Sequence, residues 1–447
     1  MIRIAFVGAG SAVFARVLIR DILQQPDLGE MEIRLMDIDR ERLEVIDGIA
    51  RRLVSTSGAK VRITSTLDRA RALDGADYVI CLVQIGGFRP ATVTDFEIPK
   101  RFGIRQTIGD TLGIGGIMRG LRTIPFLEDL AADMRRLCPE GWLINYANPL
   151  AINQWALEDL GVRTVGLCHS VRRTARQLAN YLRVPFEDLE YQAAGINHMA
   201  FFLRLAHRGE DLYPQLLALA ASGRVPSNDR VRFEVLRRFG YFVSESSYHF
   251  AEYVPYFLRR DRPDLVDAYA VPIDEYLHRC QRYEEEFRRL KAALNDPDGS
   301  VGPEGPSDED AAGIIHSLET GTERRIYANV RNHGAIDNLP PDCIVEVPCA
   351  VDRFGIHPIR VGPLPSHLAA LISSNVHVQR LTVEAARSGC RETVYRAVML
   401  DPRTAADLTL DEIEALVDEL LRHHARWLPQ FAAGTSPGSR ARVSSHG

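Results

Sequence analysis

Short apolar strands alternate with helical patterns over the first half of the sequence, and this alternation constrains the fold most. The strand patterns cover residues 3–7, 31–37, 76–84, 142–149 and 164–169, and most of the stretches between them have helical spacing. Such alternation is typical of a parallel sheet with helices on both faces. Polar residues stand at the carboxyl ends of several strands, where open α/β sheets bind ligands. The sequence therefore predicts an α/β protein with a ligand site at that edge.

The first strand pattern ends in a glycine turn, Gly8-Ala9-Gly10-Ser11, which precedes a helical pattern. Gly8 and Gly10 permit a tight turn and close approach of a pyrophosphate. Ser11 follows this turn at the start of the helix, whose N-terminal N–H groups would bind the pyrophosphate. Val13 occupies the third glycine position, so the fingerprint is incomplete. Asp37, at the end of the second strand, suits a ribose 2′-OH and favours NAD over NADP. The turn predicts a Rossmann-type nucleotide site; the alternative is a glycine-tight turn alone.

A glycine-rich loop begins at Gly109 and runs to Arg119, where a helical pattern starts. The loop contains Asp110 and closes with two arginines, Arg119 and Arg122. Its composition favours a loop that contacts an oxyanion or a sugar. A long surface turn is the alternative interpretation.

Cys168 lies at the end of one strand pattern, and His198 lies 30 residues further on, shortly after Gly195. A thiolate and an imidazole are suitable ligands for a divalent transition metal. Two ligands specify no particular metal, and the alternative is a buried cysteine beside two structural histidines, His169 and His198. Asn148, which precedes a proline at another strand end, is either a hydrogen-bonding site residue or a turn former.

Residues 245–253 combine titratable and aromatic side chains. Such mixtures are common on surface helices, so the pattern predicts an amphipathic helix with a polar outer face.

Charge and cysteine content exclude several classes of protein. The chain has 54 Lys and Arg against 59 Asp and Glu, a net charge of -5, which gives no basic face for nucleic acid or a membrane surface. No run approaches the about 20 apolar residues of a membrane helix. Seven scattered cysteines indicate a reducing compartment. We therefore expect a cytoplasmic, soluble protein.

The pattern of predicted strands and helices changes along the chain and predicts two domains. Strands and helices alternate up to about residue 195, after which longer helical patterns such as 274–294 follow. We expect an NAD-binding domain over residues 1–195 and a second domain over 196–431. Residues 296–310 read as an exposed loop, and residues 432–447, rich in Gly, Ser and Arg, as a disordered tail.

Several blocks of sequence together resemble glycoside hydrolase family 4. The blocks include residues 4–11, 35–39, 84–87, 111–125, 165–170, 195–201, 240–253 and 364–371, and the resemblance continues to residues 427–429. Members of this family carry a Rossmann half and a dehydrogenase-like α/β domain, with the active site between them. The resemblance thus implies an α/β fold with a C-terminal dehydrogenase-like domain, and a homodimer or homotetramer.

The resemblance also implies an unusual hydrolase that depends on NAD and Mn²⁺, an exception to the two-carboxylate scheme of most glycosidases. In the family, NAD⁺ takes a hydride from C3 of the sugar, which acidifies the C2 proton. After that proton is removed, the C1 group is eliminated, water adds, and the hydride returns to C3. The metal acts as a Lewis acid on the C2 and C3 oxygens.

Carried over by position, the resemblance makes Cys168 and His198 the metal ligands and Asn148 the residue that holds substrate hydroxyls. His169 takes the place of the proton donor, and Asp110 that of an acid that raises the basicity of the C2 base.

The position of the C2 base is where the sequence departs from the family. Ser246 stands where members carry Tyr or Asp, and serine is a poor base unassisted. Glu245, His249, Tyr253 or a water could serve instead, and we favour Glu245.

Within the family the resemblance favours α-galactosidase activity on a small glycoside. An α-galacturonidase or an α-glucosidase is the alternative within the family. An NAD-dependent 2-hydroxy-acid dehydrogenase is the alternative of another class, and it would not need the metal pair of Cys168 and His198.

Overall fold

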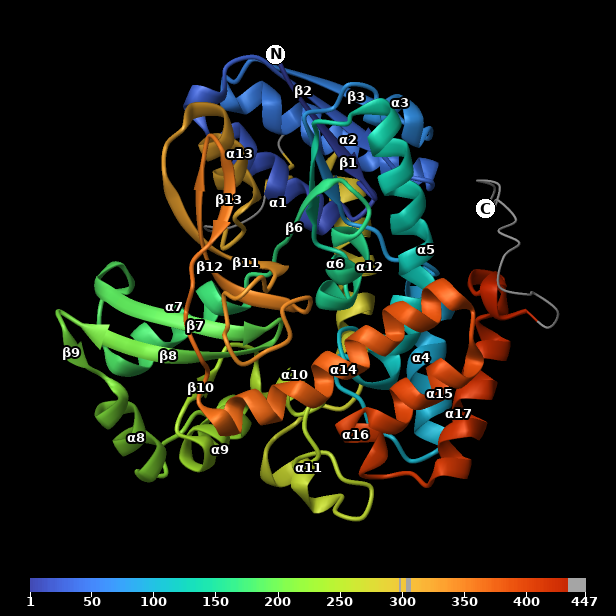
Figure 1. The fold of residues 1–447 in the computed structure, drawn as a ribbon. Helices are drawn as coiled ribbons and strands as arrows, with labels where there is room; N and C mark the ends of the chain where they lie inside the picture. The colour runs from blue at the N-terminus through green and yellow to red at the C-terminus, as the bar shows by residue number, and fades with distance from the viewer. Residues whose placement is uncertain (297–298, 303–306, 433–447) are drawn as a thin grey trace.

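The computed structural model describes residues 1–296, 299–302 and 307–432, and its strands join in one mixed sheet surrounded by helices (Figure 1). The order along the sheet is β10-β8-β7-β12-β11-β6-β5-β4-β1-β2-β3, with β13 beside β12 and β9 beside β8. The strands are β1 (Ile2–Val7), β2 (Met31–Met36), β3 (Val61–Thr66), β4 (Tyr78–Cys81), β5 (Trp142–Asn145), β6 (Arg163–Gly166), β7 (Leu189–Ile196), β8 (Met199–His207), β9 (Glu210–Asp211), β10 (Phe242–Val243), β11 (Arg324–Arg331), β12 (Ile344–Asp352) and β13 (Gly355–Pro358).

The helices connect the strands and also build a separate bundle beside the sheet (Figure 1). They are α1 (Ala12–Leu23), α2 (Arg40–Ser57), α3 (Arg69–Leu73), α4 (Val93–Arg101), α5 (Gly113–Leu137), α6 (Leu150–Glu158), α7 (Ser170–Leu182), α8 (Tyr213–Ala221), α9 (Arg230–Phe239), α10 (Ser247–Phe250), α11 (Asp264–Ala268), α12 (Glu275–Ala293), α13 (Ala311–Thr320), α14 (Ser366–Ser388), α15 (Arg391–Leu400), α16 (Pro402–Ala405) and α17 (Leu410–His423). None of the described helices is long and apolar enough to cross a membrane.

Strands β1 to β6 form a parallel sheet, as the alternating pattern predicts. The middle strand β1 pairs with β2 on one side and with β4 on the other. Its residues 4–7 are buried, which explains their continuous apolar character. The strand order reverses at β1, and such a reversal opens a crevice at the carboxyl ends of the strands, where ligands bind.

The antiparallel part of the sheet connects the end of β6 with the end of β7. Asn329 of β11 pairs with Gly166 of β6, and Glu346 of β12 pairs with Gly195 of β7. Asn329 and Glu346 also face each other between β11 and β12, so these four residues form a row across four strands. A side chain at Gly195 would collide with the backbone of β8, so glycine is required there. This row brings the segments after β6 and β7 together.

A buried ion cluster joins α4, α5 and the end of α17. Arg122 of α5 donates to both carboxylate oxygens of Asp95 on α4, at 3.0 and 2.6 Å. His424 follows α17 and contacts the same carboxylate at 2.7 Å. All three side chains are buried, so the charges of Arg122 and Asp95 depend on these contacts for compensation.

The observed architecture confirms the predicted fold class, and the helix expected over 274–294 is α12. One helix start was wrong: α5 begins at Gly113, not at Arg119. The domain boundary at residue 195 stays a prediction. The expected tail lies outside the described residues from 433 onward, and the loop at 296–310 is described only in part.

Candidate active site

The nucleotide turn has the backbone that the glycines predict. Gly8 has a φ of 87°, and a Cβ there would lie 3.0 Å from the backbone that follows β4. A Cβ on Gly10 would lie 2.7 Å from a carboxylate oxygen of Asp37. That oxygen accepts a hydrogen bond from the Gly10 N–H at 2.7 Å, so Asp37 braces the turn. Ser11 precedes α1 and makes no hydrogen bond to the first helical turn through its side chain.

Cys168, His198 and Glu245 bring three possible metal ligands together. The Cys168 Sγ lies 3.2 Å from the His198 Nε2, and this nitrogen lies 3.3 Å from the Glu245 Oε2. All three ligand atoms are within 4.8 Å of one another, the one such group of three among the described residues. Two donors bound about 2.2 Å from one ion, at angles of about 90–109°, lie about 3.1–3.6 Å apart. The two short separations fall in this range, so His198 can share one ion with Cys168 and with Glu245.

The local backbone and its partners aim these ligands. His198 lies in the turn between β7 and β8 with a φ of 65°, a conformation that is rare for a residue with a side chain. Its Nδ1 contacts the Tyr253 hydroxyl at 3.0 Å, which leaves Nε2 facing the cysteine and the glutamate. A partner on the second ring nitrogen is the usual way that proteins orient a metal-binding histidine.

The protonation of the cluster also suits a cation. Burial raises the pKa of the Cys168 thiol to about 12, and the Glu346 carboxylate acts in the same direction. Burial lowers the pKa of His198, so its imidazole is neutral at pH 7. Burial opposes ionisation of Glu245, but the neighbouring His198 and His249 hold the pKa of its carboxyl well below the usual range. A neutral imidazole and a carboxylate are ready ligands, and a bound cation would stabilise the thiolate.

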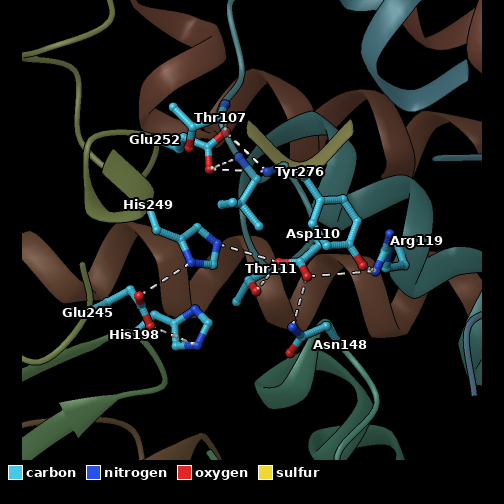
Figure 2. Close-up of polar contacts among 12 residues, drawn as sticks. Thr107, Asp110, Thr111, Arg119, Asn148, His198, Glu245, His249, Glu252 and Tyr276 are labelled. Atoms are coloured by element: carbon cyan, nitrogen blue, oxygen red, sulfur yellow. Dashed lines mark hydrogen bonds and ion pairs between the residues drawn. The ribbon is translucent and has the colours of Figure 1, made fainter. Parts of the chain in front are cut away.

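Asp110 is the centre of a second polar group (Figure 2). Its Oδ2 accepts a hydrogen bond from the Asn148 side chain at 3.0 Å and lies 3.7 Å from Arg119. Its Oδ1 accepts from the Thr111 hydroxyl at 2.7 Å and lies 3.4 Å from the His249 Nε2. Burial alone would raise the pKa of Asp110, but His249 and Arg119 lower it far below the ordinary value.

His249 joins the two groups into one site (Figure 2). Its Nε2 faces Asp110, and its Nδ1 lies 3.7 Å from the Glu245 Oε1. Burial opposes its charging, but these two carboxylates raise the pKa of His249 to about 10. A continuous chain of contacts thus runs from Asn148 through Asp110 and His249 to the metal-ligand cluster.

His169 lies beside Cys168 in sequence but contacts neither group. Its Nδ1 meets the Glu309 Oε1 at 2.9 Å, and its side chain is 43% exposed. Burial opposes its charging, whereas the hydrogen bond and charge of Glu309 raise the pKa of His169 to about 9. Ser246 immediately precedes α10, and its backbone N–H donates to the Glu245 Oε1 at 2.7 Å.

The prediction of a surface helix over residues 245–253 was wrong. Helix α10 is four residues long, and His249, Glu252 and Tyr253 in this segment are buried. Their polar groups meet partners from other parts of the chain, which a local pattern does not reveal. The alternative of a plain surface turn at residues 109–119 was also wrong, because Asp110 and Arg119 are buried.

Comparison with known proteins identifies the family. Residues 3–184 match the family 4 glycosyl hydrolases, and residues 193–404 match the C-terminal domain of that family. The chain is 42% identical to an α-galactosidase of Bacillus subtilis, over 96% of this chain and all of the relative. The chain belongs to glycoside hydrolase family 4. This result confirms the resemblance and makes the protein a glycoside hydrolase.

Two further comparisons concern relatives of this family 4 enzyme. An α-galactosidase of Rhizobium meliloti is 37% identical, over 96% of this chain and 90% of the relative. The structure of a 6-phospho-β-glucosidase of Thermotoga maritima, solved with manganese, NAD⁺ and glucose-6-phosphate, has a TM-score of 0.79 at 23% identity. The match covers 95% of this chain and 99% of that chain, so the family 4 fold extends along nearly the whole molecule.

Proposed function

We propose that this family 4 enzyme is an NAD⁺- and Mn²⁺-dependent α-galactosidase. The observation that carries the proposal is the donor set of Cys168, His198 and Glu245, in which His198 lies 3.2 Å from the cysteine sulfur and 3.3 Å from the glutamate oxygen. The identity to two α-galactosidases supports the choice of sugar. When bound, NAD⁺ would supply a reversible hydride acceptor, and Mn²⁺ a Lewis acid for the sugar oxygens.

The residues of the chain would divide the remaining work between binding and proton transfer. Gly8, Gly10 and Ser11 would hold the pyrophosphate, and Asp37 would both brace the turn and reach the ribose. Asn148, held by Asp110, would orient hydroxyl groups of the sugar.

Proton transfer would involve residues on both sides of the metal-ligand cluster. His169, oriented by Glu309, would donate a proton to the leaving group. Asp110, as a buried anion beside His249, would favour removal of a proton from the sugar. Glu245 shares the cluster with Cys168, so we propose it as a third metal ligand in place of the C2 base that the sequence suggested. An ionised carboxyl with a low pKa is a good ligand and a weak base.

The arginines of the glycine loop favour a neutral sugar over a galacturonide. Arg119 lies against Asp110 and over the ring of Tyr276, and Arg122 is paired with Asp95. Both guanidinium groups are buried and already have carboxylate partners. A C6 carboxylate would need a cation without such a partner, so these two arginines are unsuited to bind it.

The test is hydrolysis of p-nitrophenyl-α-galactoside after removal of metal with EDTA and of NAD⁺ by dialysis. We expect activity to disappear and to return only when both Mn²⁺ and NAD⁺ are added. Full activity of the stripped enzyme would overturn the proposal. Faster turnover of the matching α-galacturonide would assign the alternative sugar. Accumulation of NADH at 340 nm in proportion to substrate would indicate a dehydrogenase, because the glycosidase cycle returns its hydride.

A further inference from the structure

A buried carboxylate outside the predicted site holds the backbone that leads to Asp110 (Figure 2). Glu252 is 4% exposed, and its Oε1 accepts hydrogen bonds from the N–H groups of Thr107 at 2.6 Å and Gly109 at 3.1 Å. Its Oε2 accepts from the N–H groups of Ile108 and Gly109, both at 3.1 Å. Three successive backbone donors therefore converge on one side chain.

These bonds connect the two stretches of chain that build the polar group around Asp110. The loop at residues 107–109 leads directly to Asp110, and Glu252 follows His249 on the facing segment. A second tie runs beside the first, because the Thr107 hydroxyl donates to the backbone oxygen of Tyr248 at 2.9 Å. Asp110 and His249, which lie 3.4 Å apart, are thus held face to face by contacts that neither side chain makes itself.

This contact requires that both side-chain oxygens of residue 252 accept hydrogen bonds. A carboxylate offers two, and backbone N–H groups that point at an anion stabilise it strongly. A glutamine of the same shape would turn an NH₂ donor toward a backbone N–H and leave a buried donor without a partner. Since both Glu252 oxygens are occupied by backbone groups, Glu252 is not free to contact a sugar.

We propose that Glu252 is a positioning residue, which fixes Asp110 against His249 and so assembles the site from two distant parts of the chain. The consequence for catalysis rests on the proposed glycosidase function, whereas the clamp on residues 107–109 does not. Positioning errors of about 1 Å cost about 100-fold in rate in other enzymes, so a small shift of this loop is enough to matter.

The test compares Glu252→Gln and Glu252→Asp with the wild type. Glu32→Gln is the matched control, because Glu32 is also a buried, fully paired carboxylate but lies at the start of β2. Hydrogen exchange followed by mass spectrometry reports on the amides of residues 107–109, and turnover of p-nitrophenyl-α-galactoside reports on the site. In Glu252→Gln we expect faster exchange of these amides and a kcat lower by about 10- to 100-fold, with little change in KM.

Rescue distinguishes positioning from a general loss of stability. Glu252→Asp keeps two acceptors and should retain more activity than Glu252→Gln, whereas Glu32→Gln should lower the melting temperature without changing kcat. Should Glu252→Gln not fold, Thr107→Val loosens the same junction more gently and should lower kcat in the same direction.

Unchanged exchange at 107–109 in Glu252→Gln would overturn the clamp. Faster exchange with unchanged kcat would overturn the positioning role. A wild-type enzyme without glycosidase turnover would instead refute the proposed function, while the exchange measurement still tests the clamp.

Discussion

Substitution of Glu245 by glutamine tests whether this carboxylate is a metal ligand. The side chain approaches His198 at 3.3 Å and, through its other oxygen, His249 at 3.7 Å. Glutamine preserves the shape and one oxygen donor but removes the negative charge. The backbone N–H of Ser246, which donates to Oε1 in the wild type, can still bond to the amide oxygen. The substitution therefore isolates the charge at the cluster.

The expected magnitude follows from the small number of ligands. In the proposed site the protein would contribute three donors, so one charge would be a large share of the binding free energy. Even residues that only orient metal ligands contribute about 10- to 100-fold in affinity. We therefore expect Glu245→Gln to weaken Mn²⁺ binding at least about 100-fold, which corresponds to about 2.7 kcal/mol.

The assay is calorimetric titration of Mn²⁺ into the NAD⁺-loaded enzyme, with turnover measured at increasing Mn²⁺. For a ligand, part of the lost activity should return at high Mn²⁺, and Glu245→Asp should fall between the wild type and Glu245→Gln. An unchanged Mn²⁺ affinity combined with loss of turnover would refute the ligand role. That result would point to the C2 base, and exchange of the C2 proton with deuterated solvent should then stop as well.

Two further predictions concern the nucleotide turn and the helical bundle. Asp37→Ala removes the acceptor for the Gly10 N–H and should weaken NAD⁺ binding about 10-fold in a fluorescence titration while Mn²⁺ affinity stays unchanged; equal loss of both would contradict separate sites. The pKa of Asp95 is lowered because Arg122 and His424 outweigh the effect of burial, so its stabilisation is present above pH 3.8 and is lost as pH falls further. Asp95→Asn should lower the free energy of unfolding by about 3–5 kcal/mol at pH 7 and flatten this acid dependence in urea titrations; an equally steep acid loss in the variant would contradict it.

The parts of the site that follow strands could be predicted from the sequence. The turn at Gly8 and Gly10 and the ends of the strands before Cys168 and Asn148 depend on local patterns, because a parallel strand of apolar residues must end where the polar residues begin. The structure places these residues at the predicted positions. His198 lies instead in the turn between the antiparallel strands β7 and β8, and its approach to Cys168 depends on the pairing of β7, β12, β11 and β6.

The structure of the segment 245–253 could not be predicted in this way. Glutamate, histidine and tyrosine at these spacings suit an exposed helix as well as a buried site. What distinguishes the two is the partner of each side chain, namely His198 for Tyr253, Asp110 for His249 and the backbone at 107–109 for Glu252. These partners lie tens of residues or more away in the sequence, and single-sequence periodicity carries no information about such contacts.

The start of α5 differs from the prediction because the glycines there serve packing rather than a loop. Glycine disfavours helix formation by about 1 kcal/mol relative to alanine, so the glycines before Arg119 predict a loop. In the structure, a Cβ on Gly116 would lie 2.6 Å from the carbonyl carbon of Thr111, and one on Gly115 would collide with the backbone of Gly109. These glycines therefore serve packing, since they let the loop that carries Asp110 lie directly against the first turn of the helix. The close approach of the loop offsets the low helix propensity of these glycines, because it buries Asp110 beside Arg119 and within reach of His249.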